Sequence, residues 1–425
     1  MAYCWEPERT RRDSREEEEQ EMERRDAGGK KGPGEAGMRR NIEWNNRMPG
    51  ERRAAGSRWK RILLVVVLVI GIVAAVLVAS WRVLDAMGRS SLYSAQEHAA
   101  PTLGSQNGDG AAGEAGENGS AGSTADAQSA GSGEDWQEGW VRYQGKIYQY
   151  NSRILTFLFM GIDDMGKVTK KAGGQNGGQA DGLFLLVINP DTKKISIVAI
   201  NRNTMTEMDQ YDADGNFEYS GKGQICLAHG FGDGMQLSCE RQEKVVSNLF
   251  YKLPINGYVS INMGAVPTIN DTVGGVTVPR MRYENGKIVY GKDETIHGKE
   301  ALQYVRYRGE DFDAATYRLE KQKVYLKALC AKMLSQVKSS PGTAVSLFQE
   351  ISPYMVTDIS LSEVTYLADN LGGYSFNDDI YSLKGETTVG DQGFEEFHYD
   401  EDALYDLMIQ VFYEEVKGQD SDSAK

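Results

Sequence analysis

The sequence predicts an α/β domain, and two kinds of pattern indicate it. Three short apolar runs rich in β-forming residues, 154–160, 183–188 and 195–200, each predict a buried strand. Further along, apolar side chains recur at helical spacing from Leu319 to Met333, which predicts a long helix with one face on the core. The folded segment is long enough to bury a sizeable core.

A single membrane anchor is expected before this domain. The uncharged apolar run 62–80 is long enough, at 1.5 Å per residue, to cross the hydrocarbon core of a bilayer. Trp59 and Trp81 flank the run, and Arg58 and Lys60 on its N-terminal side predict a cytoplasmic N-terminus with the main domain outside the cell. The run is longer than a signal-peptide core and lies far from the N-terminus, so we expect an uncleaved signal-anchor.

Composition divides the rest of the chain. The first segment mixes charges of both signs with few apolar residues, and the stretch after the anchor is rich in Gly, Ala and Ser, so neither is expected to fold. The predicted organisation is a disordered cytoplasmic tail at 1–57, a transmembrane helix at 62–80, a flexible extracellular linker at 81–135, an extracellular domain at 136–417 and a disordered tail at 418–425.

Cysteines and histidines indicate no zinc site. Cys226 and Cys239 are the extracellular pair that closes a short loop, and the sequence leaves open whether a disulfide joins them. The four histidines are scattered, which is typical of surface or packing positions. The net charge of −14 makes the chain acidic, and we expect no nucleic-acid partner.

Three charged residues are expected at one edge of the sheet. The short turn 189–194 joins the second and third strands as an antiparallel hairpin, so Asp181 lies beside Arg202. Asp163 follows the first strand and joins them if that strand is antiparallel to the second. Two carboxylates with phosphate oxygens suit Mg²⁺. The alternative is that both aspartates only cap strand ends.

A basic cluster lies on and before the long helix. In this acidic chain, Arg forks grouped on one segment suggest an anion site, because they match phosphate or carboxylate oxygens in bidentate geometry. The alternative is a solvated helix face with surface ion pairs. The cluster consists of Arg306, Arg308, Arg318, Lys321 and Gln322.

Two common catalytic signatures are excluded. Residues 161–167 have the spacing of a P-loop, but Val168 stands where a hydroxyl would be needed, and no helix pattern follows. The sequence also has no G-x-S-x-G motif and no Cys/His pair suited to nucleophilic catalysis.

Several short motifs between about 155 and 334 follow a specific order. They are Gly161-Ile162-Asp163, then Asp181, Asn201-Arg202-Asn203, the segments 225–232, 270–276 and 297–302, Tyr304-Val305-Arg306-Tyr307-Arg308, and Arg318-Leu319-Glu320-Lys321-Gln322. In these motifs, and in having one anchor and an outside domain, the chain resembles the LytR-CpsA-Psr family of cell-envelope phosphotransferases, as a divergent branch.

This resemblance implies a three-layer α/β/α sandwich with a central mixed sheet and an apolar pocket for a polyprenyl tail. Asp163 and Asp181 would hold Mg²⁺, and Asp163, Arg202 and Arg318 would be catalytic. The side chains expected to contact the lipid pyrophosphate are Arg202, Arg306, Arg308, Arg318, Lys321 and Gln322.

The chain departs from the family pattern at four positions. Ala180 replaces an arginine, Asn203 an aspartate, Ala315 an aspartate, and Lys321 an arginine. If the carboxylate missing at 315 is the general base, Asp313 has to replace it, with Asp311 also nearby.

The expected function is that of a membrane-anchored, Mg²⁺-dependent transferase of a Gram-positive-type envelope. It would move a phosphate-linked glycopolymer from a polyprenyl-pyrophosphate carrier to a peptidoglycan hydroxyl in cell wall assembly. A first alternative is a non-catalytic envelope regulator that binds polyprenyl phosphates. A second is a structural or adhesive ectodomain without a small ligand.

Overall fold

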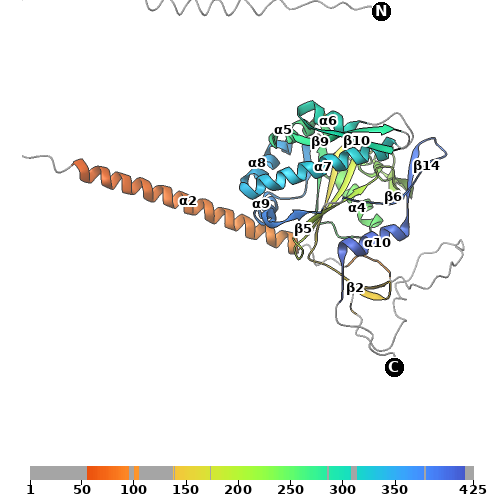
Figure 1. The fold of residues 1–425 in the computed structure, drawn as a ribbon, viewed down its shortest axis with the longest axis horizontal. Coiled ribbons are helices and arrows are strands. Elements are labelled where there is room, and N and C mark those ends of the chain that lie inside the picture. The colour runs from red at the N-terminus through yellow and green to blue at the C-terminus, as the bar shows by residue number, and fades with distance from the viewer. Residues whose placement is uncertain are drawn as a thin grey trace, which may run out of the picture. The chain divides into compact units, whose positions relative to one another are not determined.

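The computed structural model describes residues 55–94, 100–104, 137, 139–172, 174–284, 287–307, 314–377 and 380–416. The chain divides into two compact units, Met1–Val69 and Ile70–Lys425. Of the first unit, only the start of helix α2 (Ala55–Ser94) is described. The fold of the second unit is drawn in Figure 1.

A mixed sheet forms the centre of the domain. Its strand order is β11-β8-β3-β4-β5-β12, and β13 also pairs with β5. Strand β3 runs parallel to β8 and antiparallel to β4, β4 is antiparallel to β5, and β12 and β13 run parallel to β5. The strands are β3 (Leu155–Ile162), β4 (Ala180–Asn189), β5 (Lys194–Ile200), β8 (Gly257–Asn262), β11 (Met355–Thr357), β12 (Ser375–Phe376) and β13 (Tyr381–Ser382).

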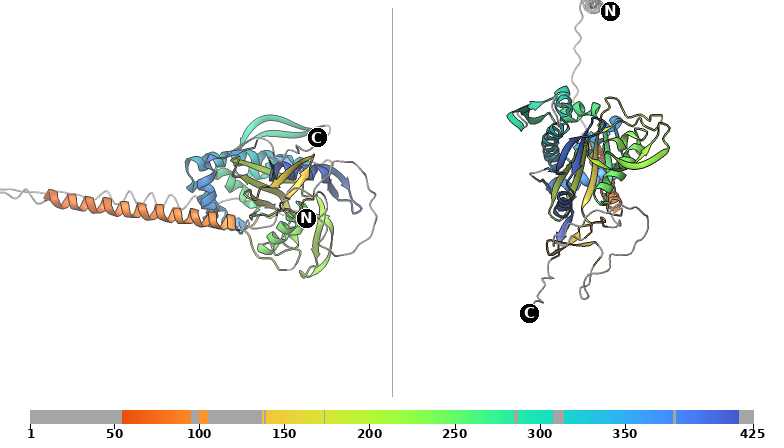
Figure 2. Two further views of the ribbon diagram at one scale, coloured as in Figure 1. Left: turned by 90° about the horizontal axis from the view of Figure 1, so that it is seen from below. Right: turned by 90° about the vertical axis from the view of Figure 1, so that its right-hand side faces the viewer.

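Helices cover both faces of this sheet, as Figures 1 and 2 show. On one face, Leu158 and Met160 of β3 belong to a buried cluster with residues of two helices, α4 and α10. On the other face, Leu155 and Phe157 pack in a cluster with residues of α5 to α8. The helices are α3 (Leu227–Gly230), α4 (Gln236–Leu249), α5 (Val266–Thr272), α6 (Gly298–Arg306), α7 (Ala314–Ser339), α8 (Gly342–Ile351), α9 (Leu361–Asn370) and α10 (Glu401–Phe412).

The alternation of side chains along β3 explains these two clusters. Successive residues of a strand point to opposite faces, so a strand that is apolar throughout must be covered on both sides. The three-layer α/β arrangement with a central mixed sheet, which the sequence analysis expected, is confirmed.

Smaller sheets and short 3₁₀ helices complete the domain. Strand β2 pairs with both β1 and β16, while β6 with β7, β9 with β10, and β14 with β15 form hairpins. These elements are β1 (Trp140–Tyr143), β2 (Lys146–Tyr150), β6 (Met205–Tyr211), β7 (Phe217–Gln224), β9 (Val276–Glu284), β10 (Lys287–Ile296), β14 (Gly385–Val389), β15 (Glu395–Tyr399), β16 (Tyr413–Glu415), η1 (Met263–Ala265), η2 (Ser352–Tyr354) and η3 (Leu371–Gly373).

Helix α2 continues beyond the predicted span. Residues Ile70–Ser94 are long and apolar enough to cross a membrane, but the last turns contact the domain instead. Leu92 is 1% exposed, and Tyr93 lies edge-on to Tyr366 of α9, with ring centroids 6.3 Å apart. Residues 81–94 are therefore helical, although the sequence analysis assigned them to a flexible linker.

The structure describes the two loop cysteines and most of the segment that has the spacing of a P-loop. Cys226 and Cys239 are buried free thiols, so the structure does not contain the disulfide that the sequence left open. The described part of the segment after Asp163 contains no helix before β4, in agreement with the exclusion of a P-loop.

Candidate active site

The hairpin register brings Asp181 and Arg202 together, as predicted. Leu183 of β4 lies opposite Ile200 of β5, and continuing this register places position 181 opposite position 202. Arg202 Nε lies 2.8 Å from Asp181 Oδ1.

Arg318 approaches the same carboxylate from helix α7. Its Nη1 lies 2.8 Å from Asp181 Oδ2, and both side chains are 3% exposed. Asp181 therefore interacts with a guanidinium through each of its oxygens. Taking these charges out of water is costly, and the pairing offsets that cost.

Asp163 and Arg306 form a second, more open pair. Asp163 follows β3, which is antiparallel to β4 as the prediction required. Arg306 is the last residue of α6, and its Nη2 lies 2.9 Å from Asp163 Oδ1, with side chains 43% and 38% exposed. An ion pair of this exposure contributes little to stability. Because both side chains are exposed, they are accessible to solvent and to a ligand.

Gln179 connects the two pairs and was not among the site residues predicted from the sequence. Its carbonyl oxygen accepts a hydrogen bond from Asp163 N at 3.1 Å. Its side-chain Oε1 accepts one from Arg202 Nη2. Arg202 Nη2 also lies 3.1 Å from Cys226 Sγ, and burial raises the pKa of that thiol to about 11. We call Asp163, Gln179, Asp181, Arg202, Arg306 and Arg318 the sheet-edge site.

Gln322 lies beside the sheet-edge site on α7, as expected. Its Nε2 donates to Val305 O at 3.3 Å. Its Oε1 is buried and has no hydrogen-bond partner among the described residues. A Cβ added at Gly182 would lie 3.7 Å from this oxygen, so Gln322 reaches β4 next to Asp181. A buried acceptor without a partner is costly, and it leaves an acceptor available beside the site.

Lys321 is held differently from the arginines. Its Nζ lies over the rings of Tyr304, Tyr307 and Tyr317, at 4.3, 4.6 and 5.8 Å from their centroids. The residue is 7% exposed. Burial lowers its pKa, while Glu294 acts in the opposite direction. The ring faces stabilise the ammonium group, and this tyrosine cage accommodates a lysine at the position where the family pattern has an arginine.

Three residues of the prediction lie outside the described residues. They are Arg308, Asp311 and Asp313, which precede α7. Their predicted roles stay predictions.

The carboxylates fit a hard cation only in part. Asp163 is accessible and keeps acceptor capacity, because each carboxylate oxygen carries two lone pairs. Asp181 is buried and already interacts with two arginines, so it could serve as a ligand only by sharing its oxygens with them. No group of three or more His, Cys, Asp or Glu in the described part of the chain is arranged to hold a metal ion. Magnesium here would depend on oxygens from a bound phosphate.

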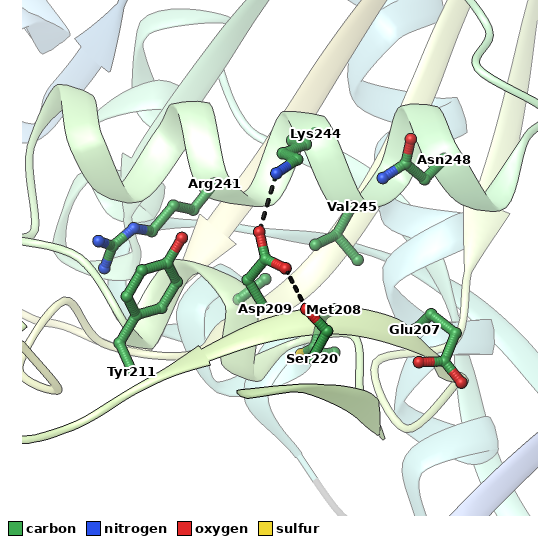
Figure 3. A pocket seen from close by; sticks show the side chains of 10 residues that line it. Glu207, Met208, Asp209, Tyr211, Ser220, Arg241, Lys244, Val245 and Asn248 are labelled. Atoms are coloured by element: carbon green, nitrogen blue, oxygen red, sulfur yellow. Dashed lines mark hydrogen bonds and ion pairs between the residues drawn. The ribbon is translucent and has the colours of Figure 1, made fainter. Parts of the chain in front are cut away.

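A separate cavity of about 130 Å³ lies between the β6–β7 hairpin and α4, drawn in Figure 3. Three of the charged residues that line it, Asp209, Arg241 and Lys244, have partners within the chain. Lys244 Nζ lies 2.8 Å from Asp209 Oδ2, Ser220 Oγ donates to Asp209 Oδ1 at 2.7 Å, and the Arg241 guanidinium stacks on the Tyr211 ring. These contacts fasten the hairpin to α4, and we assign the cavity a structural role.

Comparisons with known proteins agree with the motif pattern. The profile of the LytR_cpsA_psr family matches residues 120–409. A relative from Bacillus licheniformis is named "Polyisoprenyl-teichoic acid--peptidoglycan teichoic acid transferase TagU". It is 27% identical over 266 residues, which is 61% of this chain and 78% of the relative.

Two further matches extend the comparison. "Biofilm regulatory protein A" of Streptococcus mutans is 26% identical over 262 residues, covering 59% of this chain and 61% of that protein. The crystal structure of TagV from Bacillus subtilis matches with a TM-score of 0.45 and 21% identity, covering 61% of this chain and 95% of the other. Since the profile match covers most of the chain and contains the sheet-edge site, the protein belongs to the LytR_cpsA_psr family.

Proposed function

We propose that the protein is a membrane-anchored transferase that moves a phosphate-linked glycopolymer from a polyprenyl-pyrophosphate carrier to a hydroxyl of peptidoglycan. The observation that carries this proposal is the charge of the sheet-edge site. Three arginines (Arg202, Arg306, Arg318) face two carboxylates (Asp163, Asp181), and the excess of positive charge favours an anion. The name of the TagU relative supports the choice of donor and acceptor.

The arrangement suits phosphoryl transfer because that reaction needs mainly positioning and charge neutralisation. Arg306 is accessible and meets the incoming phosphate first, while the half-buried Arg202 and the buried Arg318 supply fixed positive charge behind it. Gln322 and Lys321 lie next to this charge on α7. No nucleophilic side chain is required.

The proposal includes Mg²⁺ held by Asp163 and, through shared oxygens, by Asp181. When bound, the ion would neutralise charge that develops on the phosphate oxygens. The chemistry of the two carboxylates supports this role. The proposed topology has the N-terminus inside and the domain outside, on the basis of Arg58 and Lys60 before the anchor.

The test uses the full chain in phospholipid vesicles. A synthetic polyprenyl-pyrophosphate-linked saccharide with a radiolabel is added with purified peptidoglycan, and label in the insoluble peptidoglycan is counted with Mg²⁺ or with a chelator. The proposal is supported if the wild type transfers the label and Arg306→Ala lowers this transfer at least about 100-fold. Loss with the chelator supports the metal assignment.

The matched control is Arg280→Ala. Arg280 belongs to the β9–β10 hairpin, and its ion pair with Glu294 is exposed. The alternative, a lipid-binding regulator, would retain the labelled lipid on the protein without transferring it. Asn203 and Ala315 stand where the family pattern has aspartates, and the loss of these carboxylates is the reason to test for lipid binding without transfer.

A further inference from the structure

A second and larger cavity adjoins the one drawn in Figure 3, and we call it the lateral cleft. Glu207 and Asn248 line both cavities. The lateral cleft has a volume of about 850 Å³, and ligand sites typically measure about 300–1,000 Å³. Its walls come from the β6–β7 hairpin, strand β15, the C-terminal end of α4 and the start of α10.

One end of the lateral cleft is close to the sheet-edge site. Met205, the first residue of β6, lines the cleft and follows Arg202 by three positions in the chain. Consecutive Cα atoms are about 3.8 Å apart, so the Cα atoms of these two residues are at most about 11 Å apart. A chain molecule bound in the cleft is therefore within a short distance of the arginines.

Most charged groups of the lateral cleft have no partner, in contrast to Asp209 and Lys244 of the smaller cavity. Glu396 and His398 pair with each other. Four further charged side chains line the cleft and have no ion pair or side-chain hydrogen bond among the described residues, namely Glu207, Lys222, Lys252 and Glu401. Their donors and acceptors are available to a polar ligand.

Two tyrosines, Tyr251 and Tyr399, add aromatic surface to this polar wall. Burial, followed by Glu401 and Tyr399, raises the pKa of Tyr251 to about 12, so its hydroxyl is neutral and can donate a hydrogen bond. Burial and then Glu401 also raise the pKa of Tyr399. Glu401 thus lies near both tyrosines, and the three side chains line one part of the cleft.

The backbone that carries Tyr251 and Lys252 is strained. Their φ values are 56° and 61°, in the left-handed region, which is unfavourable for residues with side chains. One left-handed residue, usually glycine, commonly ends a helix, but two large residues in succession persist only where the surrounding structure holds them. Thr102 holds this turn, because its N and Oγ1 both donate to Tyr251 O, at 2.7 and 3.1 Å. Strain of this kind is concentrated at ligand sites.

The chemistry of the lateral cleft fits an uncharged sugar chain better than a polyanion. Three carboxylates line it against two lysines, so a phosphate-rich polymer is not favoured there. Sugar rings have faces of partly positive C–H hydrogens, which pack on the negative face of a tyrosine ring. Sugar hydroxyls form hydrogen bonds with carboxylates and ammonium groups.

We propose that the lateral cleft binds the sugar chain of the peptidoglycan acceptor and presents its hydroxyl to the sheet-edge site. This proposal rests on the proposed function and adds to it the place where the acceptor is held.

Binding is measured first, by isothermal titration calorimetry of the full chain in detergent. The neutral probe is tetra-N-acetylchitotetraose, and an oligomer of glycerol phosphate is the anionic probe. We expect the tetrasaccharide to bind the wild type, and Glu207→Ala to weaken this binding at least about tenfold, as loss of a hydrogen bond to a charged group does. The matched control is Glu218→Ala, an exposed glutamate of the same hairpin that does not line the cleft.

Tyr399 tests the aromatic part of the cleft. Tyr399→Phe keeps the ring and should bind the tetrasaccharide within about threefold of the wild type, whereas Tyr399→Ala should bind it at least about tenfold more weakly. Because Tyr399 also packs against the core, thermal unfolding of both variants is measured in parallel. Glu207 is exposed, so Glu207→Ala remains a test even if Tyr399→Ala does not fold.

The vesicle assay distinguishes the acceptor from the donor. Glu207→Ala should raise the KM for peptidoglycan, with kcat and the KM for the lipid-linked donor unchanged, and a rise in the donor KM alone would assign the cleft to the donor and overturn the proposal. It is also overturned if the tetrasaccharide does not bind, if Glu218→Ala is equally impaired, or if the glycerol phosphate oligomer binds more tightly. A wild type that binds the tetrasaccharide but transfers nothing contradicts the proposed function and still supports a saccharide site.

Discussion

Arg318 and Asp181 form a buried ion pair across 137 positions of the sequence, with Arg318 Nη1 2.8 Å from Asp181 Oδ2. This pair joins helix α7 to the second residue of β4. Asp181 also interacts with Arg202, so one carboxylate balances two guanidinium groups. Removing one partner of a buried pair leaves an uncompensated charge and typically costs about 3–5 kcal/mol.

The two partners are therefore not equivalent. Asp181→Ala leaves two guanidinium groups without their carboxylate, whereas Arg318→Ala leaves Asp181 still paired with Arg202. We expect Asp181→Ala to lower the free energy of unfolding by about 3–5 kcal/mol and Arg318→Ala by clearly less, measured by urea unfolding of the full chain in detergent. Equal losses would show that Arg202 does not compensate.

His229 should help to hold the backbone that carries Gln179 in place beside the sheet-edge site. Its ring Nδ1 lies 3.0 Å from Gly178 O, and because a carbonyl only accepts, Nδ1 carries the hydrogen. Gly178 precedes Gln179, which orients Arg202. We expect His229→Leu to lower kcat, while His229→Asn, which keeps an N–H donor, retains more activity. The ratio of their kcat values in the vesicle assay is the measurement, and indistinguishable variants would contradict the role.

His229 should also affect the pH dependence of stability. Burial lowers its pKa from 6.5 to about 4, so between these values the unfolded chain binds more protons than the folded one. The free energy of unfolding contributed by this group therefore rises with pH up to about 6.5 and falls on acidification. We expect His229→Asn to flatten the curve of unfolding free energy between pH 4 and 6.5, with no change of slope above pH 7.

Glu243 on α4 should act with the opposite sign. Burial, followed by Asp358 and Glu240, raises its pKa from 4.5 to about 7. The folded chain then binds more protons than the unfolded one between these values, so this group's contribution to stability is lost as the pH rises from 4.5 to 7. We expect Glu243→Gln to be more stable than the wild type at pH 8 and similar to it at pH 4.5, by thermal unfolding. A constant difference across this range would refute the assignment.

The contact of helix α2 with α9 depends on a glycine. A Cβ at Gly88 would lie 2.1 Å from Ser362 O, whereas a Cβ at Gly71 in the same helix has nothing within 4 Å. Gly88→Leu should therefore separate the end of α2 from α9, and Gly71→Leu should not. Amide hydrogen exchange of α9 in the full chain is the measurement, with faster exchange expected for Gly88→Leu alone. Unchanged exchange in both variants would mean that the contact does not hold α9.

The sequence was sufficient for the part of the site that local geometry determines. The hairpin register places Asp181 beside Arg202 because the residue numbers of facing positions have a constant sum, and helical spacing places Arg318 and Gln322 on one side of α7. The turn between β4 and β5 is so short that few other registers of these two strands are possible.

Other contacts could not be read from the sequence. Glu395 reaches Asn203 from 192 positions away, and His229 reaches Gly178 from 51 positions away, so both depend on tertiary packing. The Gly177-Gly178-Gln179 run before Asp181 was an available signal for close backbone approach, since a Cβ at Gly177 would lie 2.2 Å from His229 O. The helical continuation past residue 80 was hidden by the spacer-like composition that follows it.

The docked end of α2 has a consequence for where the enzyme works. From Trp81 to Leu92 a helix rises about 17 Å, and this length is a rigid strut, unlike the variable reach of a flexible tether. If Trp81 lies at the membrane boundary, as the sequence predicts, we expect the domain to be held at a constant height above the bilayer. The proposed lipid-linked donor would then diffuse in two dimensions beneath the domain, and new polymer would be attached within a thin layer of the wall. A change in helix length would shift the height of this layer by about 1.5 Å per residue.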